Sequence, residues 1–260
     1  MRSYVVWLTL LVSWLGVSSA FAEPLVYAGP NPPFNFRDKG TVKGFGVDIL
    51  EASLSSMRGK LAQEEIELDV WNKVYASALT HPTTFLISTA RLQDRENLFQ
   101  WVGPIATVRL GVITKQGVML PKGKTIDVLK NLKIATIKET SAEQTLFKEI
   151  GTAHGLNITR VSTPIQGYKI LEYGRIDALV YTDVPFVYHL VSENQDVSQY
   201  KMAHVLLNTD YYIAAGKAVP KEQIDAMQKN LDRLKEVDSK GSRMYDRIMA
   251  HYLKGAVLQQ

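Results

Sequence analysis

The stretch "TTFLISTARLQDRENLFQWVGPI", residues 83–105, decides the fold. Its first seven residues, "TTFLIST", have the apolar and β-branched composition of a buried strand. Polar residues follow at once, and two arginines, Arg91 and Arg95, stand four positions apart. In open α/β sheets, ligands bind beyond the carboxyl ends of the strands. The stretch therefore predicts an α/β protein with a ligand site at the end of this strand.

Strand and helix signals alternate on both sides of this stretch. Two runs of strand-helix-strand-helix-strand are expected, and this order is typical of parallel, buried sheets. The expected strands cover residues 25–28, 66–71, 83–89, 132–137, 158–163 and 176–182. The expected helices cover residues 44–57, 74–79, 140–155, 165–174 and 184–192.

Two further extended segments, residues 107–115 and 210–217, flank the second run, and two amphipathic helices close the chain. This organisation predicts two α/β lobes that are joined by two extended crossings and face each other across a cleft. Lobes of this kind close around a ligand by hinge motion. The expected boundaries are a leader over 1–22, lobe 1 over 23–108, lobe 2 over 109–209, and the return hinge with the rest of lobe 1 over 210–260.

The N-terminus has the features of a cleavable signal peptide. Arg2 precedes an apolar segment over residues 5–17, and Ala20-Phe21-Ala22 matches an A-x-A cleavage site. A membrane anchor is the alternative, but the apolar segment is too short to span a bilayer comfortably. Cleavage after Ala22 leaves residues 23–260, and the chain has no cysteine for lipid attachment. These features predict export to a bacterial periplasm.

The composition excludes several classes of function. Hydrophobic residues make up 46% of the 260 residues and charged residues 22%, which is typical of a globular protein. The formal net charge is only +4, so nucleic acid is not an expected partner. The five histidines are scattered, and "GKT" at 123–125 lacks the first glycine of a phosphate-binding loop. Neither a metal nor a cofactor is therefore expected.

Ser88, Arg91 and Arg95 are the first candidate site residues. A guanidinium presents a planar set of donors that matches a carboxylate, and a hydroxyl at the strand end can donate to the same anion. The alternative is that both arginines are solvated or form ion pairs with Asp94 and Glu96.

Other candidates also have a purely structural explanation. Thr140 and Ser141 open a helix whose free N–H groups attract anions, but ordinary helix capping accounts for them as well. Asp183 follows a strand and could hold an ammonium group or cap a helix. Trp71 could stack on a ligand or pack in the core. Phe34, in the loop beyond the first strand, could form a wall of the cleft.

Several motifs occur in a fixed order along the chain. They are "PPFNF" (32–36), "GFGVDIL" (44–50), "STARLQDRENLFQWVGPI" (88–105), "ETSAEQT" (139–145) and "GRIDALVYTD" (174–183). In this order, behind a signal peptide, they resemble the bacterial extracellular solute-binding proteins of family 3, the periplasmic amino-acid receptors of ABC importers. The resemblance covers nearly the whole mature chain. It implies the two-lobe, type II periplasmic-binding-protein fold, known as the venus flytrap, with two extended hinge crossings.

The resemblance also implies a role for each candidate. Arg95 matches the arginine that binds the ligand's carboxylate, and Ser88 matches a serine that contacts the amino-acid head group. The Thr140-Ser141 pair matches the start of a lobe 2 helix near the same carboxylate. Asp183 matches the acid that binds the ammonium group, and Trp71 lies one residue from the position of a stacking aromatic.

The chain departs from the family pattern at several of these places. The aromatic expected near Asn31 and the acid expected near Ala28 are absent, and Ala90 replaces the second serine. The interval 177–183 is one residue longer than usual, and Arg91 adds a positive charge. The set of residues that binds an amino-acid head group in the family is therefore only partly present. An anionic amino acid, a peptide-like compound and a solute that is not an amino acid all remain open.

The expected function is capture of a small polar solute that bears a carboxylate, with an amino acid as the expected class. The expected partner is an inner-membrane ABC permease, and the protein is expected to be a monomer and not an enzyme. Two alternatives remain open. A periplasmic enzyme of the same fold, such as a dehydratase, would turn over its bound ligand, and a sensor without a transporter would be revealed by its neighbouring genes.

Overall fold

The computed structural model describes residues 25–138, 140–151 and 155–259, and the expected signal peptide lies outside them. The strands are β1 (Val26–Ala28), β2 (Phe36–Asp38), β3 (Thr41–Lys43), β4 (Ile66–Leu68), β5 (Phe85–Ala90), β6 (Gln100–Lys115), β7 (Lys133–Ile137), β8 (Asn157–Val161), β9 (Ala178–Thr182) and β10 (Tyr200–Ala215). The helices are α1 (Phe45–Leu54), α2 (Trp71–Thr80), α3 (Thr125–Leu129), α4 (Ser141–Ile150), α5 (Pro164–Glu172), α6 (Asp183–Ser192), α7 (Lys221–Leu234) and α8 (Met244–Leu253), with short 3-10 turns at Gln63–Glu65 and Val197–Gln199. Within the described ranges, no helix has the length and apolar character needed to cross a bilayer.

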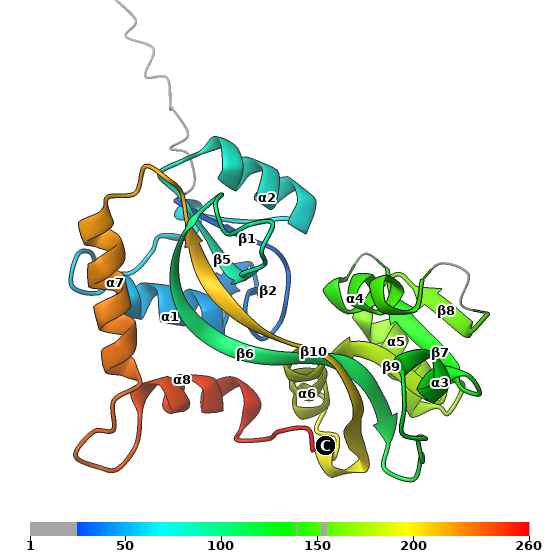
Figure 1. Cartoon of the computed structure of the whole chain (residues 1–260). Coiled ribbons are helices and arrows are strands. Elements are labelled where there is room, and N and C mark those ends of the chain that lie inside the picture. The colour runs from blue at the N-terminus through cyan, green and yellow to red at the C-terminus, as the bar shows by residue number, and fades with distance from the viewer. Residues whose placement is uncertain (1–24, 139, 152–154, 260) are drawn as a thin grey trace, which may run out of the picture.

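The first strand-helix run forms in the predicted order. Strand β1 pairs in parallel with both β4 and β5, so that Val26 lies opposite Ile66 on one side and Phe85 on the other. Helices α1 and α2 make the two crossovers. All three residues of β1 are buried, as is usual for the central strand of a parallel sheet. With α7 and α8, these elements form the first lobe (Figure 1).

The second run also forms, with corrected ends. Strand β7 pairs in parallel with β8 and β9, and α3 to α6 complete the second lobe. The helix expected over 140–155 ends at Ile150, because Gly151 adopts a φ of 75°, which a helix cannot continue through.

In the first run, Trp71 was expected to end a strand. It begins α2 instead, because the carbonyl of Val70 accepts the amides of Lys73 and Val74 and so starts a helical turn.

Strands β6 and β10 connect the lobes and pair in antiparallel register along their 16 residues each. Strand β5 pairs with one end of β10, and β9 pairs with β6, so all these strands belong to one eight-stranded sheet in the order β4-β1-β5-β10-β6-β9-β7-β8. Strands β2 and β3 form a separate hairpin. The crossings expected over 107–115 and 210–217 are therefore parts of longer strands. They run very close together, since a Cβ on Gly111 would lie 2.3 Å from the carbonyl oxygen of His204.

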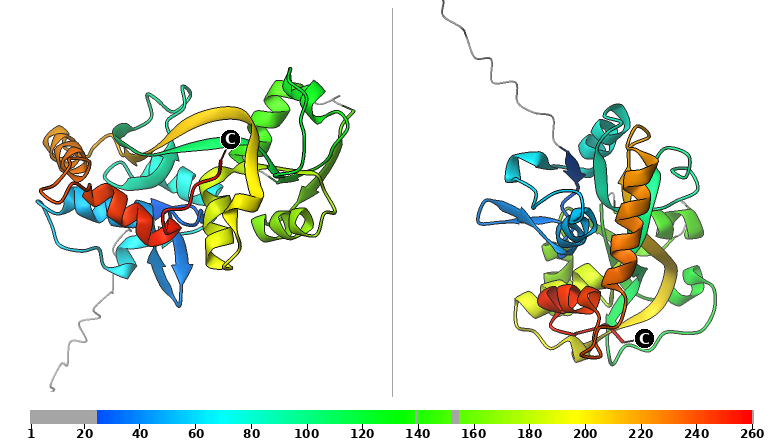
Figure 2. Two further views of the ribbon diagram at one scale, coloured as in Figure 1. Left: turned by 90° about the horizontal axis from the view of Figure 1, so that it is seen from below. Right: turned by 90° about the vertical axis from the view of Figure 1, so that its left-hand side faces the viewer.

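The C-terminal segment makes a third connection between the lobes. Helix α8 packs on α1, and the hydroxyl of Tyr252 donates to a carboxylate oxygen of Asp48 at 2.6 Å. Beyond α8 the chain turns through Gly255, with φ of 76°, and reaches the start of β10. There the amide of Met202 donates to the carbonyl of Gln259 at 2.8 Å. Figures 1 and 2 show this end of the chain beside the yellow part of the second lobe.

Candidate functional site

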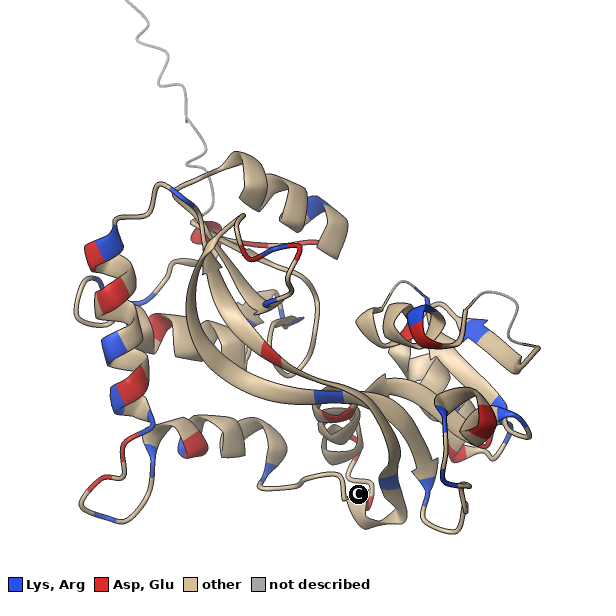
Figure 3. Ribbon diagram, viewed as in Figure 1, with Lys and Arg blue, Asp and Glu red and all other residues tan. Residues whose placement is uncertain are grey.

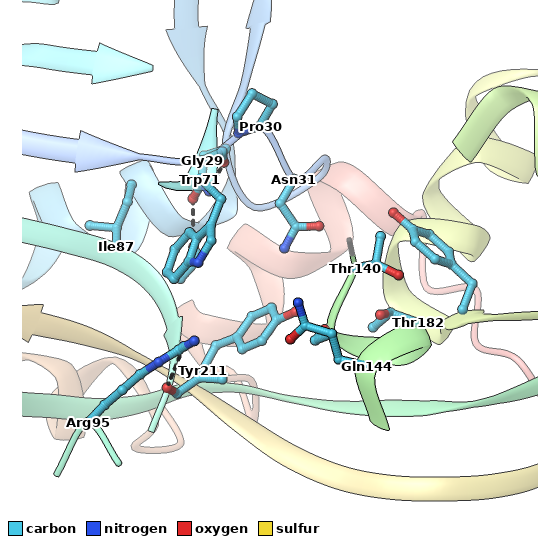
Figure 4. Close-up of a pocket in the computed structure, with 15 residues that line it drawn as sticks. Gly29, Pro30, Asn31, Trp71, Ile87, Arg95, Thr140, Gln144, Thr182 and Tyr211 are labelled. Carbon is cyan, nitrogen blue, oxygen red and sulfur yellow. Dashed lines mark hydrogen bonds between the residues drawn. The ribbon is translucent and has the colours of Figure 1, made fainter. Parts of the chain in front are cut away.

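A cavity of about 240 Å³ lies between the two lobes, beside the crossing strands (Figure 4). The first lobe supplies the loop after β1, the start of α2, and β5 with the turn that follows it. The second lobe supplies the start of α4 and the end of β9, and β10 supplies one tyrosine. The lining residues are Gly29, Pro30, Asn31, Asn35, Trp71, Ile87, Ser88, Ala90, Arg95, Thr140, Ser141, Gln144, Tyr181, Thr182 and Tyr211. A solute in this cavity would contact both lobes.

Arg95 lies in the turn after β5 and is the one charged side chain among the described lining residues. Its guanidinium carbon lies 5.3 Å from the ring centre of Trp71 and 5.2 Å from that of Tyr75. One guanidinium nitrogen also donates to the carbonyl of Ala90, at 3.4 Å. Contact between a guanidinium and aromatic faces is favourable, and donors that remain at its edge can bind an anion. Arg95 and Trp71, two separately predicted site residues, thus meet at the cavity.

Ser88 anchors the end of β5 to the loop after β1. Its hydroxyl donates to the side-chain oxygen of Asn35 at 2.6 Å, and the Asn35 amide donates to the carbonyl of Gly29 at 2.7 Å. Ser88 adopts a φ of 54°, which is uncommon for a residue with a side chain and is concentrated at functional sites. The hydroxyl of the neighbouring Thr89 instead donates to the carbonyl of Leu86 inside the lobe.

Helix α4 begins at the cavity. Thr140 is its N-cap, as predicted, because its hydroxyl oxygen accepts the amide of Glu143 at 3.3 Å. Ser141 is the first helical residue, and Gln144 follows one turn later on the same wall. Amides at a helix N-terminus are short of partners and sit at the positive end of the helix dipole. This wall of the second lobe therefore favours a negatively charged group.

The side chain of Asp183 does not line the cavity. One of its oxygens accepts the Nε of Arg109 at 2.8 Å, and the other accepts the amides of Arg109 at 3.0 Å and Val184 at 2.7 Å. The cavity is lined instead by Thr182, the residue before it. Arg109 lies on β6 and also donates to the carbonyl of Leu258. The carboxylate that the sequence places in the cleft thus ties the second lobe to a crossing strand.

Arg91 and Phe34 also lie outside the lining. The guanidinium of Arg91 forms a two-fold hydrogen bond with Glu96, as the structural alternative expects, and lies 5.6 Å from the ring centre of Trp101. Phe34 is fully buried and packs its ring edge-on against Tyr211, with 5.1 Å between the ring centres. Phe34 therefore supports a cavity residue from behind.

Comparisons with known proteins identify the architecture. No family model matches the sequence, and no curated protein matches it. A mutant of the arginine-binding protein ArgBP from T. maritima matches at 18% identity and a TM-score of 0.63, over 88% of this chain and 95% of that chain. The second substrate-binding domain of GlnP from Lactococcus lactis, in an open conformation, matches at 18% and 0.63, over 90% and 97%. A histidine kinase sensor domain with similarity to periplasmic binding proteins matches at 18% and 0.64, over 91% and 98%.

This chain has the two-lobe periplasmic-binding-protein fold. In it, the structure brings five of the eight predicted site residues to the cavity between the lobes: Trp71, Ser88, Arg95, Thr140 and Ser141. It places Phe34, Arg91 and Asp183 elsewhere.

The lining residues that were not predicted from the sequence include Gln144, Tyr181, Thr182 and Tyr211. Tyr181 and Thr182 end strand β9, so the rule that ligands gather at strand ends could have identified them. Tyr211 lies on a crossing strand and had no such signal. Burial raises the pKa of Tyr211 to about 12 and also raises the pKa of Tyr181. Both phenols are therefore protonated and able to donate at neutral pH.

Charged residues elsewhere on the molecule are of mixed sign. Figure 3 shows basic and acidic positions interspersed along α7 and across the second lobe. Several form exposed ion pairs, such as Lys221 with Asp225 and Arg243 with Asp246. Such pairs contribute little to stability, and they create no large surface of one sign. The positive charge of the cavity is therefore a local feature.

Proposed function

We propose that this protein is a periplasmic solute-binding protein that captures a small polar solute through its carboxylate. The observation that carries the proposal is the pairing of two anion-attracting groups on one cavity. Arg95 comes from the first lobe, and the N-terminus of α4, with Thr140 and Ser141, comes from the second. An anion between them would be stabilised by both, and it would hold the lobes together. A soluble capture protein of this kind delivers its solute to an ABC permease.

Features outside the cavity support the same proposal. Residues 1–22 have the features of a cleavable signal peptide, which agrees with a periplasmic location. The solved structures of the same fold include an ancestral arginine-binding protein bound to arginine and the substrate-binding protein of an amino acid ABC transporter. These neighbours are binding proteins and not enzymes. We expect the protein to act as a monomer and to leave its solute chemically unchanged.

Sensing is a second candidate function, favoured by a specific observation. The histidine kinase sensor domain has the same fold over 98% of its length. Capture and sensing use the same cavity and differ only in the protein that reads the closed state. Deletion of the gene that encodes this protein separates them. Loss of solute uptake supports transport, whereas unchanged uptake with an altered transcriptional response supports sensing.

The first test is a thermal-shift screen of residues 23–260 against amino acids, 2-hydroxy acids, dicarboxylates and polyamines. A solute that binds only the folded state at 100 times its Kd adds about 2.7 kcal/mol to the free energy of unfolding. We expect at least one carboxylate to raise the melting temperature, and we expect Arg95→Ala to remove the shift. Arg91→Ala is the matched control, because it deletes a nearby guanidinium that does not line the cavity. Equal binding by wild type and Arg95→Ala would contradict the proposal.

A further inference from the structure

We propose that the cavity selects carboxylates that carry no ammonium group, such as 2-hydroxy or 2-oxo acids, over the corresponding amino acids. This inference rests on the proposed function and narrows its solute class. It starts from the charges on the cavity wall. Arg95 is charged, and the other described lining side chains are neutral hydroxyls, amides, aromatic rings and aliphatic groups. The described part of the wall therefore offers one positive charge for a carboxylate and only neutral acceptors for a cation.

The carboxylate that follows Thr182 in the chain is already engaged. Asp183 accepts three hydrogen bonds through its two oxygens, two of them from Arg109, and its residue is 7% exposed. Arg109 is held in turn by the carbonyl of Leu258. To bind a ligand's ammonium group, Asp183 would have to leave Arg109. The partly buried guanidinium of Arg109 would then lack its carboxylate partner. The cost of breaking such a pair makes this exchange unfavourable.

The geometry of the strand end explains why the acid faces away. Thr182 is the last residue of β9, and Asp183 is the first residue of α6. At this junction of strand and helix, only one of the two residues lines the cavity, and the carboxylate of the other turns to Arg109. The structure gives that position to Thr182. A neutral hydroxyl thus stands where an acid would be needed to balance an ammonium group.

The remaining polar groups suit an oxygen-rich, anionic solute. The phenols of Tyr181 and Tyr211 stay protonated at neutral pH, because burial raises the pKa of each. The N-terminus of α4 adds backbone N–H donors on the wall of the second lobe. These groups donate to carboxylate, hydroxyl or keto oxygens. An ammonium group would meet only neutral acceptors and no described charge of opposite sign, so the cost of desolvating its charge would be poorly offset.

The test measures matched sets of solutes by calorimetry on residues 23–260. Each set is an amino acid with its 2-hydroxy and 2-oxo counterparts: alanine, lactate and pyruvate; phenylalanine, phenyllactate and phenylpyruvate; glutamate, 2-hydroxyglutarate and 2-oxoglutarate. In the set that binds best, we expect the hydroxy or oxo acid to bind at least about tenfold more tightly than the amino acid, which is about 1.4 kcal/mol. Thr182→Asp adds a carboxylate to the wall and should reverse this order, whereas the neutral control Thr182→Asn should preserve it.

The outcomes separate this inference from the proposed function. Tighter binding of the amino acid, lost in Arg95→Ala, overturns the inference and leaves carboxylate capture standing. Tighter binding of the hydroxy or oxo acid that Thr182→Asp does not change also overturns it, because the missing charge would not set the preference. If the folded protein binds no member of any set at millimolar concentration, the proposed function fails and the inference fails with it.

Discussion

The hydroxyl of Ser88 donates a hydrogen bond to the side-chain oxygen of Asn35, with 2.6 Å between the two oxygens. This contact joins the end of β5 to the loop after β1, and both segments line the cavity. Gly46 makes this hydrogen bond possible. A Cβ at position 46 would lie 2.3 Å from the hydroxyl oxygen of Ser88 and 2.8 Å from the side-chain oxygen of Asn35. A glycine in α1 thus determines the shape of one cavity wall.

Gly46→Ala should therefore destabilise the protein, since its methyl group would displace both Ser88 and Asn35. Overpacking of this kind typically costs about 1–3 kcal/mol, and urea unfolding of the ligand-free protein would measure it. Gly59→Ala is the matched control, because nothing lies within 4 Å of a Cβ at that position. We expect the control to change stability by less than about 0.5 kcal/mol. Equal effects of the two variants would contradict the tight contact at Gly46.

The pair of Arg109 and Asp183 should stabilise the junction of β6 and α6. Arg109→Met removes the guanidinium and leaves a carboxylate whose side chain is only 10% exposed. Hydrogen bonds to charged groups contribute about 1.5–3 kcal/mol each, so we expect a loss in this range in urea unfolding. Arg91→Met breaks an exposed pair with Glu96 and should cost less than about 1 kcal/mol. A small loss in Arg109→Met, equal to that of the control, would show that the pair contributes little.

His189 should make stability fall in mild acid. Burial lowers the pKa of His189, although the nearby Glu193 and Glu172 partly oppose this effect. The imidazole also stacks on Tyr168, with 4.1 Å between ring centres. In the unfolded chain its pKa is about 6.5, so below that pH the unfolded state binds more protons. The free energy of unfolding should therefore decline as the pH falls below about 6.5.

Melting temperatures between pH 7.5 and pH 5 would check this expectation. The decline should be smaller in His189→Gln than in the wild type. His251→Gln replaces an exposed histidine and should keep the wild-type decline. Parallel curves for the wild type and His189→Gln would mean that another group causes the loss.

Trp71 should report ligand binding by fluorescence. Residues 23–260 contain two tryptophans, Trp71, which lines the cavity, and Trp101, which does not. Trp101→Phe should keep a ligand-induced change in emission, and Trp71→Phe should lose most of it. Trp71→Ala also removes an aromatic face from Arg95. The binding free energy of the ligand should therefore weaken by about 0.5–1 kcal/mol, the contribution of an exposed cation–π contact. A signal that persists in Trp71→Phe would place the ligand elsewhere.

The sequence predicts the helices and strands well, but not the pairing between strands that are distant in the chain. Strand periodicity and helix signals are local, so the order of both strand-helix runs was predicted correctly, with errors at element ends such as Trp71 and Gly151. That β6 and β10 extend into both lobes and join them in one sheet depends on pairing between distant segments. Local sequence carries no signal for such pairing.

The candidate site shows the same division. Arg95, Ser88 and the Thr140-Ser141 pair follow the strand-end and helix-start rules, and they line the cavity. Asp183 obeys the same rule but lies one residue too far along. Which of two neighbouring side chains faces the cavity depends on where β9 becomes α6, and the sequence leaves this boundary uncertain by more than one residue. Its partner Arg109 lies 74 positions away in the chain, beyond the reach of any local pattern.

The third connection affects how this protein should be labelled. Tyr252 of α8 is hydrogen-bonded to Asp48 of α1 in the first lobe. Gln259 is hydrogen-bonded to Met202, near the start of β10, in the second lobe. The few residues between these two contacts form a short segment that connects the lobes. A dye or purification tag attached at the C-terminus would move with the second lobe and could strain this segment. A dye near residue 25 would stay with the first lobe, so dyes near residues 25 and 259 would form a donor and acceptor pair that reports the distance between the lobes.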